Sequence, residues 1–291
     1  MSTGIESLPI GFIGAGRLGK ALAWSLASAG LRVACVASAR TAAARDLAAR
    51  IPGCEAVRPQ DVANRCDLVF ITTPDSAIEQ ACSALHWRAG TAVVHCSGAT
   101  EVGVLAHAAS QGAQAGGFHP LQTFGDPDAA VASLPGSTIT IEAAEPLNGR
   151  LVAIAQRLRC NVNRLPPGMR ARYHAAAGFT SQFVNVLFAQ AAQAWASWGG
   201  TEEDVVRALA PLVRGTLASI GSAGIAGGMP GPVSRGDLGS VEKHLEGLAG
   251  LGPGMLDFYR LMCGCTVDLA QTHGTLDELR ARRFRDALAP T

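Results

Sequence analysis

The stretch PIGFIGAGRLGKALAWSLASAGLRVACVAS, residues 9–38, decides the fold. It opens with an apolar segment from Ile10 to Ile13, which predicts a buried β-strand, and a glycine-rich turn follows. A helical pattern then runs to a terminating Gly30, and a second apolar strand is predicted from Leu31 to Val36. A GxGxxG motif alone is weak evidence. Strand, turn, helix and strand within about 30 residues, however, predict a dinucleotide-binding βαβ unit.

Each glycine of this turn has a predicted role. Gly14 allows the tight turn, Gly16 lets the backbone approach a pyrophosphate, and Gly19 lets the helix pack on the sheet. The N–H groups at the start of the helix, at Arg17 and Leu18, have no partner within the helix and are expected to face the phosphates. The alternative is a glycine-rich turn that binds no ligand.

The end of the second strand indicates which dinucleotide binds. An NAD site usually has a carboxylate there, on the ribose 2′-hydroxyl, whereas this chain has no acid from Val36 to Thr41. Ser38, Arg40 and Thr41 could instead bind a 2′-phosphate, with the guanidinium of Arg40 supplying charge. We therefore expect NADP as the cofactor. The alternative is that Arg40 is a solvated residue at a helix start.

Three further apolar strands are predicted, and each leads into a polar turn. The turns begin at Thr73 and Pro74, at Ser97 and at His119. Helical patterns lie between the strands, around residues 76–85 and 101–110. Strands that alternate with helices predict a doubly wound, mainly parallel α/β sheet, in which ligands bind at the carboxyl ends of the strands. Thr73, Pro74 and Ser97 are therefore expected to contact the cofactor.

His119 is predicted to leave its strand at this same edge of the sheet, with Pro120 favouring an extended backbone before the turn. Together with Gln122 and Ser97, it would surround the reactive end of the cofactor. A structural histidine, bonded to a neighbouring loop, is the other interpretation for His119 and, separately, for His95.

Pro166, Pro167 and Gly168 interrupt the pattern and predict a domain boundary. Residues 1–165 would form an NADP-binding Rossmann domain, and residues 166–291 an all-α domain for substrate binding and dimerisation. The second domain begins with a helical pattern that runs from Met169 to Trp198.

One face of this long helical pattern carries polar side chains, among them His174, Gln182 and Asn185. No charged residue occurs between Arg172 and Glu202, so this face is a candidate functional surface, with ordinary solvated surface as the alternative. Farther along the chain, an arginine could hold an anionic group of a substrate, namely Arg235.

Helix limits in the second half are predicted from caps and breakers. Three helix starts are expected, at Thr201 with Asp204, at Asp237, and at Thr275 with Glu278. Pro211 should kink or divide its helix, and a glycine-rich loop is expected from Gly221 to Gly231.

Composition limits the classes of function. The chain of 291 residues is 48% hydrophobic with a formal net charge of +1, which predicts a sizeable core and no general attraction to nucleic acid or to an anionic membrane. No apolar run is expected to span a membrane. The eight cysteines are scattered and lack the spacing of a zinc site, which indicates reduced thiols in a cytoplasmic protein without a metal.

Five motifs resemble one bacterial family, described as a Rossmann-like domain joined to a C-terminal domain of unknown function. They are GFIGAGRLG (11–19), HCSGA (95–99), FHPLQTF (118–124), YHAAAGF (173–179) and GPVSRGD (231–237). More distantly, the chain resembles the ketopantoate reductases, β-hydroxyacid dehydrogenases and pyrroline-5-carboxylate reductases, whose C-terminal domain is like that of 6-phosphogluconate dehydrogenase. The resemblance implies a homodimer that reduces a small substrate with NADPH in an interdomain cleft. The lysine of the related dehydrogenases is absent, and His174 lies in the comparable region. The family often has asparagine where Gln182 stands.

We expect hydride transfer from NADPH to a carbonyl or imine carbon, and the resemblance implies a ketopantoate-like 2-oxo acid as the first substrate class. His174 is the first candidate proton donor and His119 the second, because histidine gives and regains a proton near neutral pH. Ser97, Gln182 and Asn185 would orient the substrate, and Gln122 and Arg235 would bind it. The alternatives are a deazaflavin-dependent oxidoreductase and a non-catalytic sensor that binds NADP.

Overall fold

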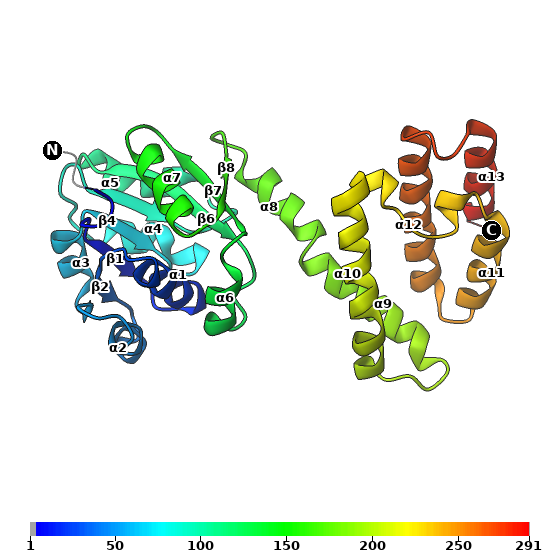
Figure 1. Ribbon diagram of the computed structural model, residues 1–291, viewed down its shortest axis with the longest axis horizontal. Coiled ribbons are helices and arrows are strands. Elements are labelled where there is room, and N and C mark those ends of the chain that lie inside the picture. The colour runs from blue at the N-terminus through cyan, green and yellow to red at the C-terminus, as the bar shows by residue number, and fades with distance from the viewer. Residues whose placement is uncertain (1–3, 291) are drawn as a thin grey trace. The chain divides into compact units, whose positions relative to one another are not determined.

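The computed structural model describes residues 4–290, and the chain divides between Gly178 and Phe179 into two compact units (Figure 1). The first unit ends thirteen residues beyond the domain boundary predicted at residue 165. The reason is that helix α8 (Arg170–Phe179) packs with the first unit up to Gly178. The boundary at 165 stays a prediction about domains.

The first unit is built on one sheet of eight strands in the order β3-β2-β1-β4-β5-β6-β7-β8. All neighbouring strands run parallel except β6 and β7, which are antiparallel. This confirms the predicted doubly wound, mainly parallel α/β fold. The strands are β1 (Ile10–Ile13), β2 (Val33–Ala37), β3 (Glu55–Ala56), β4 (Leu68–Ile71), β5 (Ala92–His95), β6 (Gln114–Leu121), β7 (Thr138–Ala143) and β8 (Asn161–Arg164).

Helices cover both faces of this sheet. One face packs against α1 (Arg17–Ser28), α2 (Thr41–Ala49), α6 (Pro127–Ser133) and α7 (Leu147–Arg157). The other packs against α3 (Pro59–Arg65), α4 (Ile78–Ser83) and α5 (Ala106–Ser110), with short 3₁₀ turns η1 (Asp75–Ala77) and η2 (Val102–Leu105) before the last two. Central strands buried on both faces require near-continuous apolar runs, such as LVFI in β4.

The core of the first face contains three phenylalanines in contact, Phe12 stacked on Phe70 and Phe118 meeting Phe70 edge to face. The ring centroid of Phe70 lies 5.3 Å from that of Phe12 and 5.4 Å from that of Phe118, and all three side chains are buried. Aromatic pairs at these distances stabilise a core beyond the burial of their area. They hold β1, β4 and β6 together, which are three of the strands whose carboxyl ends form the site described below.

Strand β6 continues farther than the sequence predicts. His119 does not leave the sheet, because β6 runs on to Leu121. Its pairing with β5 ends at Gly117, and the last four residues pair only with β7. His119 therefore projects beyond the end of β5, at the carboxyl edge where the sequence places it, but from within a strand.

The second unit is helical, as predicted. It contains α9 (Gln182–Ala196), α10 (Glu202–Gly227), the 3₁₀ turn η3 (Val233–Arg235), α11 (Leu238–Ala249), α12 (Pro253–Thr272) and α13 (Glu278–Leu288). Its small core joins η3, α11, α12 and α13. Helix α9 has no buried residue, and α10 buries only Val205 and Ala226.

Several predicted helix limits are wrong. The single helix expected from Met169 to Trp198 is two helices, because the backbone of Ser181 is non-helical (φ −125°, ψ −89°). Serine and threonine side chains compete for backbone hydrogen bonds, which favours such breaks. Pro211 does not divide α10, whose non-helical residue is Gly224 at φ +77°. The helix thus continues into the predicted glycine-rich loop.

Of the predicted caps, two are present. Thr201 and Asp204 form a capping box at α10, and Asp237 accepts a hydrogen bond from the Ser240 N–H at the start of α11. The third is wrong: Asp277 caps α13, whereas the Thr275 hydroxyl bonds to the carbonyl of Ala270.

One helix among residues 4–290 is long and apolar enough to cross a membrane, contrary to the expectation from the sequence. This is α10, with a mean hydropathy of 1.2 over its most apolar window. A single such helix is weak evidence for membrane insertion, since the helices of many other proteins pass the same test.

Candidate cofactor and active site

The glycine turn after β1 is pressed against the end of β4. Gly14 has φ +116°, and a Cβ atom there would lie 2.6 Å from the Thr72 carbonyl carbon. A Cβ atom on Gly19 would lie 2.6 Å from the carbonyl oxygen of Gly14. The Thr72 hydroxyl donates a 2.8 Å hydrogen bond to that same oxygen. Only glycine fits at positions 14 and 19, which agrees with their predicted roles.

The start of α1 has the features of a phosphate cradle. Gly16 is the N-cap residue and is exposed, and a Cβ atom built on it would meet no other atom within 4 Å. No side chain caps the helix, and its first turn, which begins with Arg17 and Leu18, holds no acid. Unpaired N–H groups and the positive end of the helix dipole favour an anion here. Nearby on the loop after β4, the buried hydroxyl of Thr73 has no partner among the described residues.

The end of β2 fits a second phosphate. Arg40 is the exposed N-cap residue of α2, Thr41 is the first residue of that helix, and its first turn contains no acid. Ser38 lies between them and β2 and is half-buried. The residues at both phosphate positions thus fit NADP, while an acid for a ribose hydroxyl is absent from residues 36–41.

His95, the last residue of β5, is a structural histidine. Its side chain is fully buried, and Nδ1 accepts a 3.2 Å hydrogen bond from the N–H of Ser97. Burial, reinforced by the positive charge of Arg170, lowers the pKa of His95 to about 3. The imidazole is therefore neutral at pH 7 and unsuited to proton donation.

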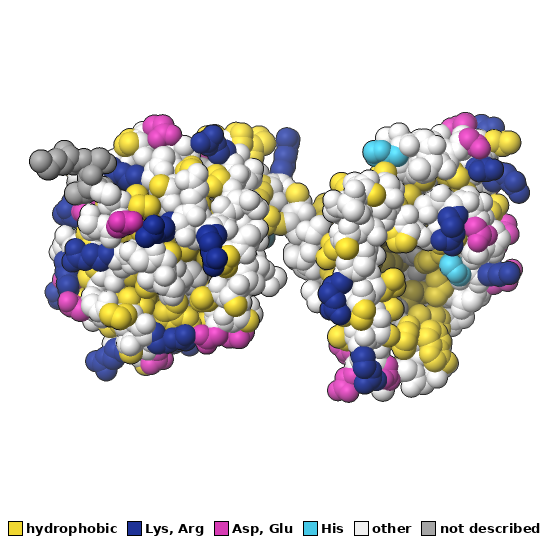
Figure 2. All heavy atoms as spheres, in the orientation of Figure 1, with side chains coloured by type: hydrophobic (Ala, Val, Ile, Leu, Met, Phe, Trp, Pro, Cys, Tyr) yellow, Lys and Arg dark blue, Asp and Glu magenta, His cyan; other side chains and the backbone are white. Residues whose placement is uncertain are grey.

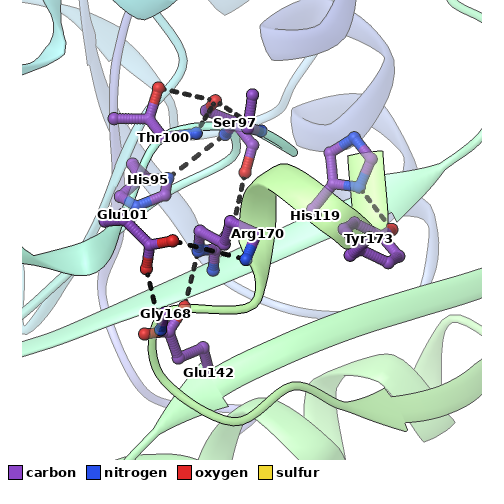
Figure 3. Close-up of polar contacts among 10 residues, drawn as sticks. His95, Ser97, Thr100, Glu101, His119, Glu142, Gly168, Arg170 and Tyr173 are labelled. Atoms are coloured by element: carbon purple, nitrogen blue, oxygen red, sulfur yellow. Dashed lines mark hydrogen bonds and ion pairs between the residues drawn. The ribbon is translucent and has the colours of Figure 1, made fainter. Parts of the chain in front are cut away.

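The hydroxyl of Ser97 shapes the loop after β5. It donates to Asp75 Oδ2 at 2.8 Å. It also accepts from the N–H of Thr100 at 3.0 Å (Figure 3). These bonds hold the turn Ser97–Gly98 in place. The predicted contacts of Ser97 with substrate and cofactor remain predictions.

His119 lies beside Tyr173 of α8. Its Nδ1 is 2.7 Å from the phenol oxygen, and the two rings meet edge to face with centroids 5.5 Å apart (Figure 3). Burial, then the neighbouring His174 and Arg170, lowers the pKa of His119 to about 4, so this imidazole is neutral at pH 7. Burial also raises the pKa of Tyr173, which keeps its proton.

His174 follows on the same helix and meets His119. The two ring centroids are 6.3 Å apart. A Cβ atom at Gly98 would lie 2.6 Å from Cδ2 of His174 and 2.9 Å from Nε2 of His119, so both imidazoles pack on the backbone of Gly98. His174 is the more exposed of the two histidines. The structure thus brings together three of the candidate groups, His119, His174 and the Ser97 loop.

Other predicted residues lie elsewhere. The amide of Gln122 is bonded to the carbonyl of Ser133 at the end of α6 and to the N–H of the adjacent Thr123. Gln182 begins α9, Asn185 lies one turn later, and Arg235 ends η3, all in the second unit. Their roles in substrate binding remain predictions, as does that of Pro74, which is exposed beside Thr73.

Sequence analysis missed Tyr173, Thr72 and Arg170. The position of Tyr173 could have identified it, because it directly precedes His174, a candidate catalytic residue. The sequence also held a signal for the place that Arg170 occupies: two successive glycines in a predicted strand, Gly116 and Gly117, indicate that another group comes close to the backbone.

Two family matches divide the chain. Residues 3–120 match the Rossmann-like domain, and residues 137–266 match DUF2520, a domain of unknown function. The chain joins a Rossmann-like domain to a DUF2520 domain. The DUF2520 match begins before β7, so Tyr173 and His174 belong to it while His119 belongs to the Rossmann-like match. No curated protein matches the sequence.

Solved structures resemble the chain over nearly its full length. The "putative NADP oxidoreductase BF3122" of Bacteroides fragilis is 27% identical, with a TM-score of 0.70 over 90% of this chain and 98% of that chain. Protein TM1727 of Thermotoga maritima is 21% identical, with a TM-score of 0.75 over 91% and 99%. An imine reductase of Myxococcus stipitatus, in complex with NADP+, is 15% identical, with a TM-score of 0.63 over 95% and 99%. The Rossmann-like and DUF2520 domains thus have a fold in common with these proteins.

Replacing Gly16 by alanine should separate cofactor binding from folding. The new methyl group meets no protein atom within 4 Å but enters the predicted pyrophosphate position. We expect NADPH affinity to fall about 10- to 100-fold, the equivalent of ~1–3 kcal/mol of steric overlap, with an unchanged melting temperature. Fluorescence titration with NADPH measures the effect, and Gly125→Ala, also at an open position, is the control. Equal affinity of Gly16→Ala and wild type would exclude this cradle.

Proposed function

We propose that this chain is an NADP-dependent oxidoreductase. It transfers a hydride from NADPH to the carbonyl or imine carbon of a small, carboxylate-bearing substrate such as a ketopantoate-like 2-oxo acid. The observation that carries the proposal is the presence, at one carboxyl edge of the sheet, of an uncapped α1 start and of the packed side chains of His119, Tyr173 and His174. Ligands of doubly wound sheets bind along this edge.

The relatives support the same class of reaction. The Bacteroides fragilis protein is named an NADP oxidoreductase, and imine reductases and reductive aminases of similar fold were crystallised with NADP+ or NADPH. The 2-oxo acid is supported by the resemblance to ketopantoate reductases and by the predicted anion-binding role of Arg235. Imines are kept as a second substrate type because two solved imine reductases, from Aspergillus terreus and Pseudomonas sp., have a similar fold.

Bound NADPH would supply the hydride. The first turn of α1 would hold its pyrophosphate, and Ser38, Arg40 and Thr41 its 2′-phosphate. His119 is neutral, and where Tyr173 donates to its Nδ1, the proton of this imidazole is on Nε2. There it can donate a hydrogen bond to the substrate oxygen or nitrogen. A neutral imidazole is a poor acid, so proton donation falls to the more exposed His174.

Arg40→Ala should change cofactor selectivity. Hydrogen bonds to charged groups contribute ~1.5–3 kcal/mol, so the Kd for NADPH should rise roughly 10- to 100-fold. The Kd for NADH, which has no 2′-phosphate, should stay the same. Calorimetric titration with both cofactors tests this, and Arg45→Ala, an exposed arginine on the same helix, is the control. Equal losses for NADPH and NADH would contradict the assignment.

His174→Ala should lower turnover ~10²–10⁴-fold, the usual contribution of a general acid, while NADPH binding is retained. The assay follows NADPH oxidation with a panel of 2-oxo acids and cyclic imines, and His86→Ala, an exposed histidine far along the chain, is the control. Full activity of His174→Ala would refute its role as donor.

The same assay decides between the proposal and its rivals. A non-catalytic sensor binds NADPH but oxidises none of it with any substrate of the panel. A deazaflavin-dependent enzyme fails to bind NADPH and reduces substrate only with the deazaflavin.

We also propose that the protein is a cytoplasmic homodimer that assembles through the second unit. Large apolar side chains are exposed on α9, α10 and α12, namely Phe183, Val186, Leu187, Val206, Leu212, Leu217, Ile225, Leu261 and Met262. A groove of about 570 Å³ lies between α9, α11 and α12, with Trp198 and Phe258 among its lining residues, and Figure 2 shows hydrophobic side chains gathered in a hollow of this unit. One chain thus carries both an apolar ridge, on α10, and an apolar groove. In a symmetric dimer, the ridge of each copy can pack into the groove of the other, so both apolar surfaces are buried.

Leu217→Asp should convert the dimer to a monomer, because it places a charge on the apolar face of α10, where Leu217 is 61% exposed. Light scattering after size exclusion should give twice the chain mass of 29.9 kDa for wild type and for the control Leu279→Asp, at an exposed position of α13. A wild-type monomer that binds lipid vesicles would assign these faces to a membrane instead. The three acids in the first turn of α10 disfavour that outcome for an anionic bilayer.

A further inference from the structure

A charged side chain lies fully buried beneath the candidate site. Arg170, the first residue of α8, is 0% exposed. Its Nε donates to Glu142 Oε2 on β7 at 2.5 Å, and its Nη1 donates to the carbonyl oxygen of Ser97 at 2.6 Å (Figure 3). A buried ion pair contributes little net stability, because removing two charges from water offsets much of their attraction. Its presence beneath the candidate site therefore points to a task other than stability.

The sheet leaves space for this guanidinium. A Cβ atom on Gly117 of β6 would lie 1.7 Å from Nη2 of Arg170, so no other residue at position 117 is compatible with the observed side chain. Gly117 pairs with His95 across β5 and β6. The guanidinium therefore lies against the backbone of β6 at the point where β5 ends.

Glu101 fixes the start of the same helix from another direction. Its carboxylate accepts from the N–H of Gly168 at 3.2 Å and from the N–H of Arg170 at 3.3 Å (Figure 3). The first turn of α8 is thus bonded to β7, to the loop after β5 and to the residue before η2.

The reacting groups of the candidate site follow one turn later. Tyr173 and His174 are three and four residues after Arg170, so they lie on the adjoining turn of the same helix side. They reach the His119 imidazole and the backbone of Gly98, the residue that follows Ser97. One guanidinium therefore bonds both to the helix that carries Tyr173 and His174 and to the loop on which His174 and His119 pack.

We infer that Arg170 is a positioning residue for the proposed reaction. Through Glu142 and the Ser97 carbonyl, it holds α8 so that Tyr173 orients His119 and His174 lies over Gly98. Because it is fully buried, it acts through these side chains and touches neither substrate nor cofactor. The inference rests on the proposed function for its effect on turnover, and on the structure alone for its effect on the imidazoles.

Gly117→Ala tests the inference without removing any of these side chains. The added methyl group forces the guanidinium from its place. Misplacement of reacting groups by about 1 Å can cost ~10²-fold in rate, so kcat should fall by about that factor. The Kd for NADPH should stay within about twofold, because the cofactor is held at α1. Gly103→Ala, at an open position in η2, is the matched control and should leave both constants unchanged.

A second variant covers the case in which Gly117→Ala does not fold. Arg170→Met with Glu142→Gln removes both buried charges together, so no unpaired charge is left to unfold the protein. It should show the same loss of kcat with retained NADPH binding and a near-normal melting temperature. Wild-type kcat in either folded variant would overturn the inference. So would a parallel loss of kcat and NADPH affinity, since that would assign Arg170 to the general stability of the first unit.

Long-range ¹H–¹⁵N spectra of the histidines give a readout that needs no substrate. In wild type and Gly103→Ala, the Nδ1 of His119 should carry the signature of its hydrogen bond to Tyr173, and Tyr173→Phe identifies that signal. In Gly117→Ala it should be lost. If wild type turns over no substrate but this change occurs, the proposed reaction fails and the positioning by Arg170 stands. If wild type is active and the His119 signal is the same in all folded variants, the positioning by Arg170 is refuted.

Discussion

The close contact between the β1–α1 turn and the end of β4 is the constraint on which the site depends. Gly14 at φ +116° brings the chain against the backbone of Thr72, and Gly19 lets α1 approach the Gly14 carbonyl within the space a methyl group would need. The Thr72 hydroxyl closes this contact with a hydrogen bond. Because the turn is held there, α1 begins at the carboxyl edge of the sheet with its N–H groups unpaired, which makes this edge attractive to phosphate. Each later strand that ends at the same edge adds side chains to one common region.

The fold of the first unit could be predicted from sequence because its signals are local. Strands such as β4 and β5 are short apolar runs bounded by polar turns, and the glycine spacing identifies the first crossover. The helix limits of the second unit were harder to predict from sequence. Thr275 and Asp277 are both good N-cap residues, and the choice between them depends on tertiary packing that no local rule contains. Likewise, the apolar stripe across α8 and α9 continues through the break at Ser181, so periodicity alone reads one helix.

The residues of the candidate site also fall into those that local sequence signals identify and those that depend on long-range contacts. His119, His174 and Ser97 were recognisable as chemical groups at predicted strand ends or on a predicted helix face. What joins them was not, because Arg170 meets Glu142 at a separation of 28 residues and Ser97 at 73. Those contacts depend on β7 entering the sheet antiparallel to β6, which places Glu142 opposite Gly117. A one-residue change of that register would turn Glu142 to the other face of the sheet. The glycine pair Gly116–Gly117 in β6 indicates that another group packs against this backbone, but it does not identify Arg170 as that group.

The buried guanidinium also bears on how the two candidate histidines divide their work. Burial is the main cause that lowers the pKa of both His95 and His119, and the positive charge of Arg170 acts in the same direction. His119 is thereby kept as a neutral imidazole whose Nδ1 lies 2.7 Å from the Tyr173 hydroxyl, and where that hydroxyl donates, Nε2 carries the proton. Such a group can orient and polarise a substrate by donating a hydrogen bond. It does not readily give up its one remaining N–H proton, because the product would be an imidazolate anion. In the proposed reaction the proton must therefore come from another group, one that is more exposed to water. On the edge described here, that group is the imidazole of His174, carried one helical turn away from the charge that holds its helix in place.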